Sequence, residues 1–193
     1  MARPRNFDET VVLHQAMNVF WSKGYEASTL SMLLKATGLS KSSFYDSFGS
    51  KHELFLATFN LYHNNRINIL NSHLLTAENK FQGISNFFHS ILDIAGDKER
   101  LSGCMSVNEA IELAPHDPKF RELVEADFQK VEDVFFETIT IGNAQGSITS
   151  KEDARVLARF LVVSLHGLHV MNRAESNQQR IIDAIAIILK TLL

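Results

Sequence analysis

Apolar side chains recur along this chain at intervals of three and four residues, the spacing that places them on one face of a helix. The first set is Leu13, Ala16, Met17 and Phe20. No run of alternating apolar and polar residues indicates a β-strand. The pattern therefore predicts an all-α protein.

Capping residues divide this pattern into about nine helices. The first is expected between an Asp8 N-cap and a stop at Gly24. The fourth is expected to begin with a capping box, in which Ser50 and Glu53 bind each other's backbone amides, and to reach about Leu75. The others are expected from Ser28-Thr29 to Gly38, from Ser40 to about Phe48, over about 78–95 and 104–114, from Pro118 onward, from a Ser150 cap to about Arg173, and from about Asn177 to the C-terminus.

Two lobes are expected, one over residues 1–52 and one over residues 53–193. The long helix after Ser50 would belong to both lobes, so no linker separates them. The whole chain carries a formal net charge of −3, which excludes a uniformly basic nucleic-acid coat. Residues 1–60 carry +1, so the remainder carries −4. The N-terminal lobe is thus mildly basic relative to the rest.

The chain of 193 residues has one cysteine, which excludes an internal disulfide and fits a reducing compartment. The N-terminus lacks the apolar segment of a signal peptide. Every stretch of about 18 residues is interrupted by a charged residue, so no membrane span is expected. A cytoplasmic protein with no membrane partner is the expectation.

Two short helices joined by a turn at Thr37-Gly38-Leu39-Ser40 describe a helix-turn-helix. In this motif the second helix enters the DNA major groove, and its first residues meet the bases. Hydroxyls and amides at helix N-termini suit phosphate oxygens. Spacing alone leaves open an ordinary pair of packed helices with capping serines. Base contacts are expected from Lys41, Ser42, Ser43 and Asp46, and phosphate contacts from Thr29, Ser40 and Lys51.

Two stretches carry a family resemblance. Residues 20–29 read FWSKGYEAST, which matches the family pattern F-x-x-x-G-Y/F-x-x-T/S-T/S. Residues 36–55 read ATGLSKSSFYDSFGSKHELF, which matches A-x-G-V/I/L-S-x-x-S/T-L/F/I-Y-x-x-F-x-S/D-K-x-x-L. The chain resembles the TetR family of one-component transcriptional regulators, densely so over about residues 9–56.

The resemblance implies particular roles in the N-terminal lobe. Tyr45 and Lys51 stand where the family usually contacts phosphates. Asp46 departs from the basic residue or histidine of many members, and it can accept from a cytosine amine or weaken binding. Two arginines, Arg3 and Arg5, flank a proline and would suit an A·T-rich minor groove. The alternative for that arm is a solvated N-terminus.

The last two predicted helices suggest a subunit interface. The final one is apolar nearly all round, which indicates burial on most sides. As in the family, two such helices from each subunit would form a four-helix interface, and a homodimer would need a pseudo-palindromic operator. Burial within one chain is the alternative. The expected interface residues are Leu161, Leu165, Leu168, Ile185, Ile188 and Leu192.

An effector pocket is expected in the same lobe, although its apolar members would serve equally well as core. His166 and His169 share a helix face and are candidate effector contacts. Further ligands at recognisable spacing are missing, so neither a metal nor another cofactor is expected. Cys104, at a helix start, is a candidate reactive thiolate or a small buried apolar residue. The expected pocket comprises Phe88, Ile91, Cys104, Asn108, Phe128, Val131, Phe135, His166 and His169.

These observations favour a regulator that binds double-stranded DNA, a repressor released from its operator by an unknown small-molecule effector. The alternatives are an activator, a thiol sensor acting through Cys104, and a helical ligand-binding protein that does not bind DNA. No enzyme is expected, because the chain lacks His-Glu-x-x-His, Cys-x-x-Cys, a glycine-rich phosphate loop and Gly-x-Ser-x-Gly.

Overall fold

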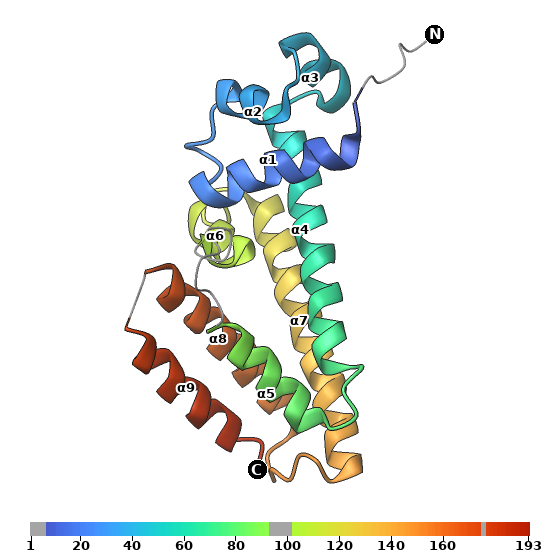
Figure 1. Ribbon diagram of the computed structural model, residues 1–193, viewed down its shortest axis with the longest axis vertical. Coiled ribbons are helices and arrows are strands. Elements are labelled where there is room, and N and C mark those ends of the chain that lie inside the picture. The colour runs from blue at the N-terminus through green and yellow to red at the C-terminus, as the bar shows by residue number, and fades with distance from the viewer. Residues whose placement is uncertain (1–6, 93–101, 175–176) are drawn as a thin grey trace. The chain divides into compact units, whose positions relative to one another are not determined.

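The chain folds into α-helices, as expected. The computed structural model describes residues 7–92, 102–174 and 177–193, which form nine α-helices and no strand (Figure 1). The chain divides into two compact units, Met1–Asn64 and Asn65–Leu193. The division falls within the long helix α4 (Lys51–Leu74), so the units share an element. Arg3 and Arg5 lie outside the described residues.

The first unit contains α1 (Glu9–Lys23), α2 (Leu30–Thr37), α3 (Lys41–Phe48) and the first part of α4. Aromatic rings dominate its small core. Phe20 meets Phe55 edge to face at a ring-centroid distance of 4.9 Å, and Phe44 is fully buried. Each such ring contributes roughly 1.5–3 kcal/mol through burial. The core therefore fixes α3 against the rest of the unit.

The expected caps account for the helix starts in this unit. Asp8 accepts hydrogen bonds from the amides of Thr10 and Val11. Thr29 accepts from the Met32 amide and Ser40 from the Ser43 amide. These side chains satisfy amides that have no partner inside a helix. The Ser50 hydroxyl accepts from the Glu53 amide at 3.0 Å, which confirms that half of the capping box.

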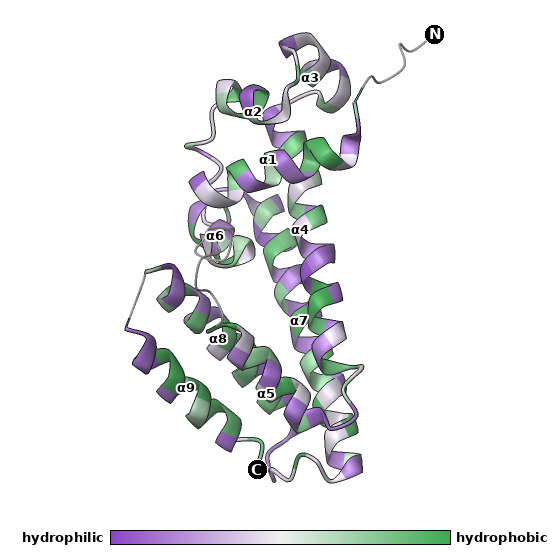
Figure 2. Cartoon of the chain, in the orientation of Figure 1, coloured by the Kyte–Doolittle hydropathy of each residue, from purple (hydrophilic) through white to green (hydrophobic). Residues whose placement is uncertain are grey.

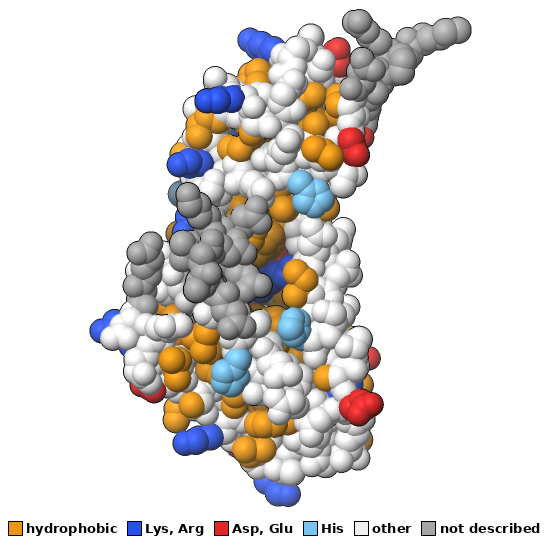
Figure 3. All heavy atoms as spheres, viewed as in Figure 1, with side chains coloured by type: hydrophobic (Ala, Val, Ile, Leu, Met, Phe, Trp, Pro, Cys, Tyr) orange, Lys and Arg blue, Asp and Glu red, His pale blue; other side chains and the backbone are white. Residues whose placement is uncertain are grey.

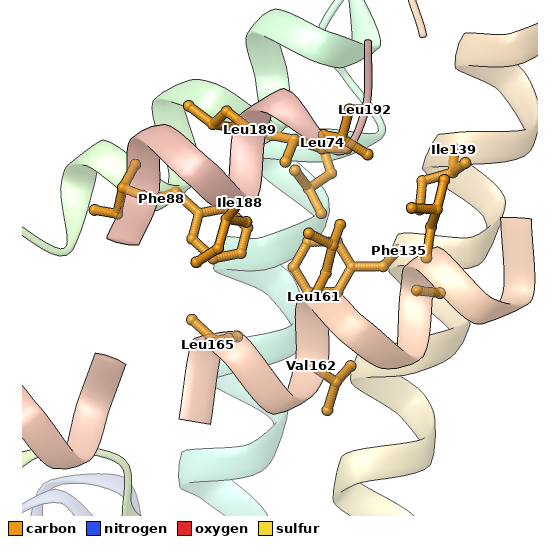
Figure 4. Close-up of a cluster of buried hydrophobic side chains, with 14 of the residues drawn as sticks. Leu74, Phe88, Phe135, Ile139, Leu161, Val162, Leu165, Ile188, Leu189 and Leu192 are labelled. Atoms are coloured by element: carbon orange, nitrogen blue, oxygen red, sulfur yellow. The ribbon is translucent and has the colours of Figure 1, made fainter. Parts of the chain in front are cut away.

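The second unit contains the rest of α4 with α5 (Lys80–Ser90), α6 (Met105–Glu112), α7 (Pro118–Gln145), α8 (Ala154–Arg173) and α9 (Gln178–Lys190). Leucines, isoleucines and phenylalanines from α4, α5, α7, α8 and α9 meet in one core (Figure 4). Hydrophilic and hydrophobic residues are interspersed along the helices (Figure 2). Each helix thus turns one face inward and another to solvent.

Helix α8 begins later than expected. Its N-cap is Asp153, which accepts from the amides of Arg155 and Val156, and not Ser150. A carboxylate at a helix N-terminus also interacts favourably with the helix dipole, which favours the aspartate over the serine. The Ser150 amide instead donates to the carbonyl of Leu192. The segment before α8 is therefore attached to the C-terminal end of the chain.

Two shorter helices also differ slightly from expectation. Helix α6 begins at Met105 because Cys104 is its N-cap, and it ends at Glu112. Helix α5 begins at Lys80 because the side chain of Asn79 caps it. The expected continuation of α5 to about residue 95 passes beyond Leu92 and lies there outside the described residues.

A buried lysine closes the C-terminal end of α4. The ammonium group of Lys80 donates at 2.7 Å to the carbonyls of both Leu75 and Ala77. Carbonyls at a helix C-terminus lack partners within the helix and attract positive charge. Lys80 therefore stabilises the turn from α4 into α5, a role that the sequence pattern did not reveal.

Helix α8 is long and apolar enough to cross a membrane by length and composition alone. Its residues Leu157, Leu161 and Leu165 lie in the core of the second unit, against α7 and α9. The core helix of a globular unit has the same composition, so this feature is weak support for a membrane span.

Candidate nucleic-acid interface and effector lobe

Helices α2 and α3 form the expected helix-turn-helix. The turn between them contains Gly38 in the left-handed conformation, with φ of 68°. Glycine adopts this conformation without the steric cost that other residues carry. Leu33, Leu39 and Phe44 are buried beneath the turn. The angle between the two helices is thus set by a tight turn and an apolar core.

The side of α3 opposite Phe44 is open to solvent. Tyr45 is 45% exposed, and Lys41, Ser42 and Asp46 are also exposed. Lys41 and Ser42 open α3, and Tyr45 and Asp46 each lie one turn further along it. The structure therefore brings the expected base-contacting residues together on one accessible face.

Three serines at the start of α3 form a hydroxyl cluster. The hydroxyl of Ser40 lies 3.0 Å from that of Ser42 and 2.9 Å from that of Ser43. It also accepts from the Ser43 amide at 3.1 Å. The cap thus holds both neighbouring hydroxyls in place. Ser43 is half-buried and Ser42 exposed, so Ser42 is the more accessible of the two to a DNA base.

Lys51 is positioned by an aromatic ring. Its ammonium group lies 4.2 Å from the centroid of the Tyr25 ring, within the range of a cation–π contact. Tyr25 in turn packs edge to face on Phe55 at 5.0 Å. A lysine held in this way loses less side-chain entropy when it binds a phosphate. The sequence identified Lys51 but not the contribution of Tyr25.

Thr29 is exposed at the start of α2, where its hydroxyl accepts from the Met32 amide at 3.2 Å. Lysine and arginine side chains are scattered over the first unit on the face seen in Figure 3. Few of them lie on α3 itself, where Lys41 is the one basic residue. The positive charge on α3 is therefore modest.

The second unit holds a buried polar network that was not predicted from the sequence. Arg66 of α4 donates to Asp127 of α7 at 2.8 Å, and Asp127 is only 1% exposed. The other guanidinium nitrogen of Arg66 lies 3.2 Å from Nε2 of His166. Asp127 falls at helical spacing between the buried Val124 and Val131. That spacing was the available signal, because a carboxylate on a core face needs a partner.

His166 is held neutral in this network. Burial, reinforced by the positive charge of Arg66, lowers the pKa of His166 to about 4 against the opposing effect of Asp127. Its neutral Nε2 can then accept from Arg66. The ring also packs on Phe128 at a centroid distance of 4.2 Å. Burial and Arg66 likewise lower the pKa of His169 to about 3.

The apolar residues expected to line a pocket are packed mostly against one another. Phe88 stacks on Phe135 at a centroid distance of 6.0 Å. Both belong to the core with Ile91 and Val131. These four residues therefore serve as core, and of the expected apolar set only Phe128 is partly exposed. Among the described residues, no group of three or more His, Cys, Asp and Glu side chains is placed to hold a metal ion.

Helix α6 and its N-cap hold a buried cysteine and several buried polar side chains. Cys104 is 1% exposed and makes no side-chain capping hydrogen bond. Asn108 is partly buried and donates to the Ser102 carbonyl at 3.1 Å. Glu109 and Ser106 are fully buried, although no sequence pattern predicted a role for either residue. Burial, with a smaller effect of Glu112, raises the pKa of Glu109 to about 8.

The six residues expected at a subunit interface lie instead in the core of their own chain. Their exposure is 5% or less in every case, so they have almost no surface left to bury against a second chain. These positions agree with the alternative of burial within one chain. The large apolar residues that α8 and α9 do expose are Val156, Phe160, Val163, Val170, Ile182 and Ile187.

Two family models match the chain. The model described as bacterial regulatory proteins, tetR family, matches residues 12–58. The model described as tetracyclin repressor-like, C-terminal domain, matches residues 81–188. The first match covers the helix-turn-helix, and the second covers most of the other unit.

Curated relatives extend over nearly the whole chain. An uncharacterised HTH-type transcriptional regulator, YezE of Bacillus subtilis, is 30% identical over 193 residues, which is all of both chains. The HTH-type transcriptional repressor ComR of Escherichia coli is 25% identical over 182 residues, 94% of this chain and 87% of that protein.

Solved structures share the fold. A cysteine mutant of the TetR family transcriptional regulator CifR, complexed with 26-bp double-strand operator DNA, superposes with a TM-score of 0.86 at 27% identity. The match covers 99% of this chain and all of the other. The reduced form of Escherichia coli NemR gives a TM-score of 0.85 at 20% identity, with 95% and 96% of the two chains covered.

Proposed function

Since this chain belongs to the TetR family of DNA-binding transcriptional regulators, we propose that it is a repressor that a small-molecule effector releases from its operator. The observation that carries this proposal is the accessible face of α3. Phe44 is buried in the core, whereas four other residues of the helix are exposed to solvent: Lys41, Ser42, Tyr45 and Asp46. The printed description of ComR as a repressor supports the direction of regulation.

On DNA, the proposed contacts fall into two classes. Lys41, Ser42, Ser43 and Asp46 read base edges in the major groove, which determines sequence preference. Thr29, Ser40, Tyr45 and Lys51 contact phosphates, which sets position and general affinity. Arg3 and Arg5 are proposed to reach the minor groove beside them.

The proposed active form is a homodimer in the cytoplasm. The exposed apolar side chains of α8 and α9, among them Phe160 and Val163, supply the surface that a second chain would cover. Two reading helices related by a two-fold axis require a pseudo-palindromic operator. In this proposal residues 1–52 bind DNA, and residues 53–193 bind the effector and the second subunit.

Release requires that the effector bind the DNA-free state more tightly than the DNA-bound state. By linkage, operator DNA then weakens effector binding by the same factor. Buried polar groups of the second unit, Glu109 among them, are the groups that such an effector would contact.

Operator binding tests the proposal. The operator would be found by selection from random DNA and measured by gel shift. Lys51→Ala is expected to weaken binding about equally on all sequences and to reduce the salt dependence by roughly one ion. Lys151→Ala, on the exposed surface before α8, is the matched control and should change little.

Full operator affinity in a protein that carries both Tyr45→Ala and Lys51→Ala would contradict the assignment of the DNA-binding face. A reporter gene behind the selected operator separates repression from activation. Expression that rises when the regulator is deleted supports repression, and expression that falls contradicts it.

A further inference from the structure

Helix α6 buries a carboxyl group and a hydroxyl group that have no hydrogen-bond partner. Glu109 is 1% exposed and Ser106 is fully buried. Among the described residues, both carboxyl oxygens of Glu109 and the hydroxyl of Ser106 lack a partner. The two residues are three positions apart, so they share a face of the helix. Buried polar groups in folded proteins almost always have partners, which makes this pair exceptional.

The surrounding charges do not compensate the Glu109 carboxyl. Helix α6 packs against α7 and α8. Glu112, on the same helix, opposes ionisation of Glu109, and Arg173 of α8 favours it more weakly. On α7, Asp127 is already paired with Arg66. The net result, dominated by burial, is a pKa of about 8 for Glu109, so that roughly nine-tenths of the group is protonated at pH 7.

Buried apolar side chains adjoin the two polar residues along α6, together with Asn108 and Glu112. Cys104, Met105 and Val107 are buried beside the two polar residues. A ligand at this position would therefore meet a cluster of polar atoms in largely apolar surroundings, the usual composition of a small-molecule site.

We propose that Glu109 and Ser106 bind the amino group of the effector, and that the effector is a primary amine with an apolar body. A primary ammonium group has three N–H donors, which match the two carboxyl oxygens and the hydroxyl oxygen left without partners. An alcohol brings one donor, and a carboxylate or phosphate dianion brings none for these three oxygens. The assignment rests on the proposed function, because it names the effector of that regulator.

Binding of an ammonium ion would change the protonation of the site. The protonated Glu109 releases its proton to solvent, and the carboxylate that remains pairs with the ammonium group. The histidines of the same unit do not take part, since His166 and His169, with pKa values of about 4 and 3, stay neutral between pH 6 and 8. Amine affinity should therefore rise roughly tenfold from pH 6 to pH 7 and about fivefold more by pH 8.

Calorimetry on the full chain tests this without DNA. The probes are n-alkylamines from methylamine to hexylamine, benzylamine, and benzyl alcohol as the uncharged analogue, each at pH 6, 7 and 8. At least one amine is expected to bind, more tightly than its alcohol, with proton release that shows as a dependence of the heat on the buffer. Glu109→Gln should lower amine affinity at least tenfold at pH 8 and abolish the pH dependence.

Two further variants complete the experiment. Ser106→Ala should weaken amine binding severalfold and keep its pH dependence, whereas Glu125→Gln, an exposed acid on α7, should change neither. The proposal is overturned if no amine binds, if benzyl alcohol binds as tightly as benzylamine, or if Glu109→Gln binds amines like the wild type. A gel shift without amine reports separately on DNA binding, so a failed effector assignment is distinguishable from a failed proposed function.

Discussion

At the scale of single residues, buried carboxyl groups of this protein differ in whether they have a partner. Asp127 is as deeply buried as Glu109, but it is paired with Arg66 at 2.8 Å. Breaking such a pair leaves an uncompensated charge and is strongly destabilising. Glu109 has no such partner among the described residues. Its carboxyl group costs stability in the resting protein, which leads to a direct prediction.

Glu109→Leu is expected to stabilise the protein, and to do so more at high pH. The native pKa of about 8 lies above the ordinary value of 4.5, so between these values the native state holds a proton that the unfolded state releases. Wild-type stability therefore falls as pH rises through this window. The gain from Glu109→Leu should be larger at pH 8 than at pH 5 by on the order of 2–4 kcal/mol.

Urea unfolding at pH 5, 6.5 and 8 measures this difference, with Glu125→Leu as the exposed control. Equal gains at all three pH values would mean that Glu109 is ionised, and therefore paired, in the native protein.

Asp46 is expected to influence which sequence is bound. It is exposed on α3, where a carboxylate accepts from a cytosine amine and rejects a base without a donor. Asp46→Ala should relax the preference at one position of each half-site, by about 1–3 kcal/mol. Selection from a randomised operator library reads this out. A variant that selects the wild-type sequence with unchanged stringency would remove Asp46 from base readout.

At the scale of helices, the ends are fixed by side chains from outside the helix as well as within it. The amides at the start of α3 are capped by Ser40, a local residue that the sequence pattern identifies. Lys80, which belongs to the next helix, donates to the carbonyl of Leu74 at the end of α4 and to two carbonyls in the turn after it. The connection from α4 to α5 thus depends on a charge whose role is tertiary.

Lys80→Met should lower the free energy of unfolding by about 1–3 kcal/mol, because the carbonyls of Leu75 and Ala77 lose a charged donor. The methionine keeps most of the apolar length of the side chain. Denaturant unfolding measures the change, with Lys119→Met as the control on an exposed site. If the two variants prove equally stable, the hydrogen bonds of Lys80 contribute nothing net.

At the scale of the whole molecule, some apolar residues of α8 and α9 are buried in the core and others are exposed on the surface. Leu161, Leu165 and Ile185 face the core of their own chain, whereas Val163 is 72% exposed. A nearly all-apolar helix leaves both uses open, because periodicity cannot tell an intrachain neighbour from a second subunit. The two faces are expected to respond differently to a charge.

Val163→Glu should separate the subunits of the proposed homodimer and leave each folded, because the carboxylate remains in water in the monomer. Ile185→Glu should instead unfold the chain, since it buries a charge without a partner at a cost of several kcal/mol. Light scattering after gel filtration gives the mass, and circular dichroism gives the helix content. A folded dimer for Val163→Glu, or a folded monomer for Ile185→Glu, would reverse the assignment of the two faces.

Features that depend on neighbours along the chain could be predicted from the sequence. Helical periodicity gave the all-α class, and the caps Asp8, Thr29 and Ser40 gave the starts of the first three helices. The helix-turn-helix followed for the same reason, since its turn at Gly38 and its buried Phe44 lie within a few residues of one another. Local order of this kind can be read from a single sequence.

The pairing of residues on distant helices could not be predicted from the sequence. The tertiary structure placed Arg66 beside Asp127, 61 positions apart along the chain, and put Phe88 and Phe135 into the core. It also left Glu109 and Ser106 buried without partners among the described residues. Periodicity shows which face of a helix turns inward, but partners for buried polar groups come from helices far away in the sequence. The physical reason is that burial and pairing are properties of the packed molecule.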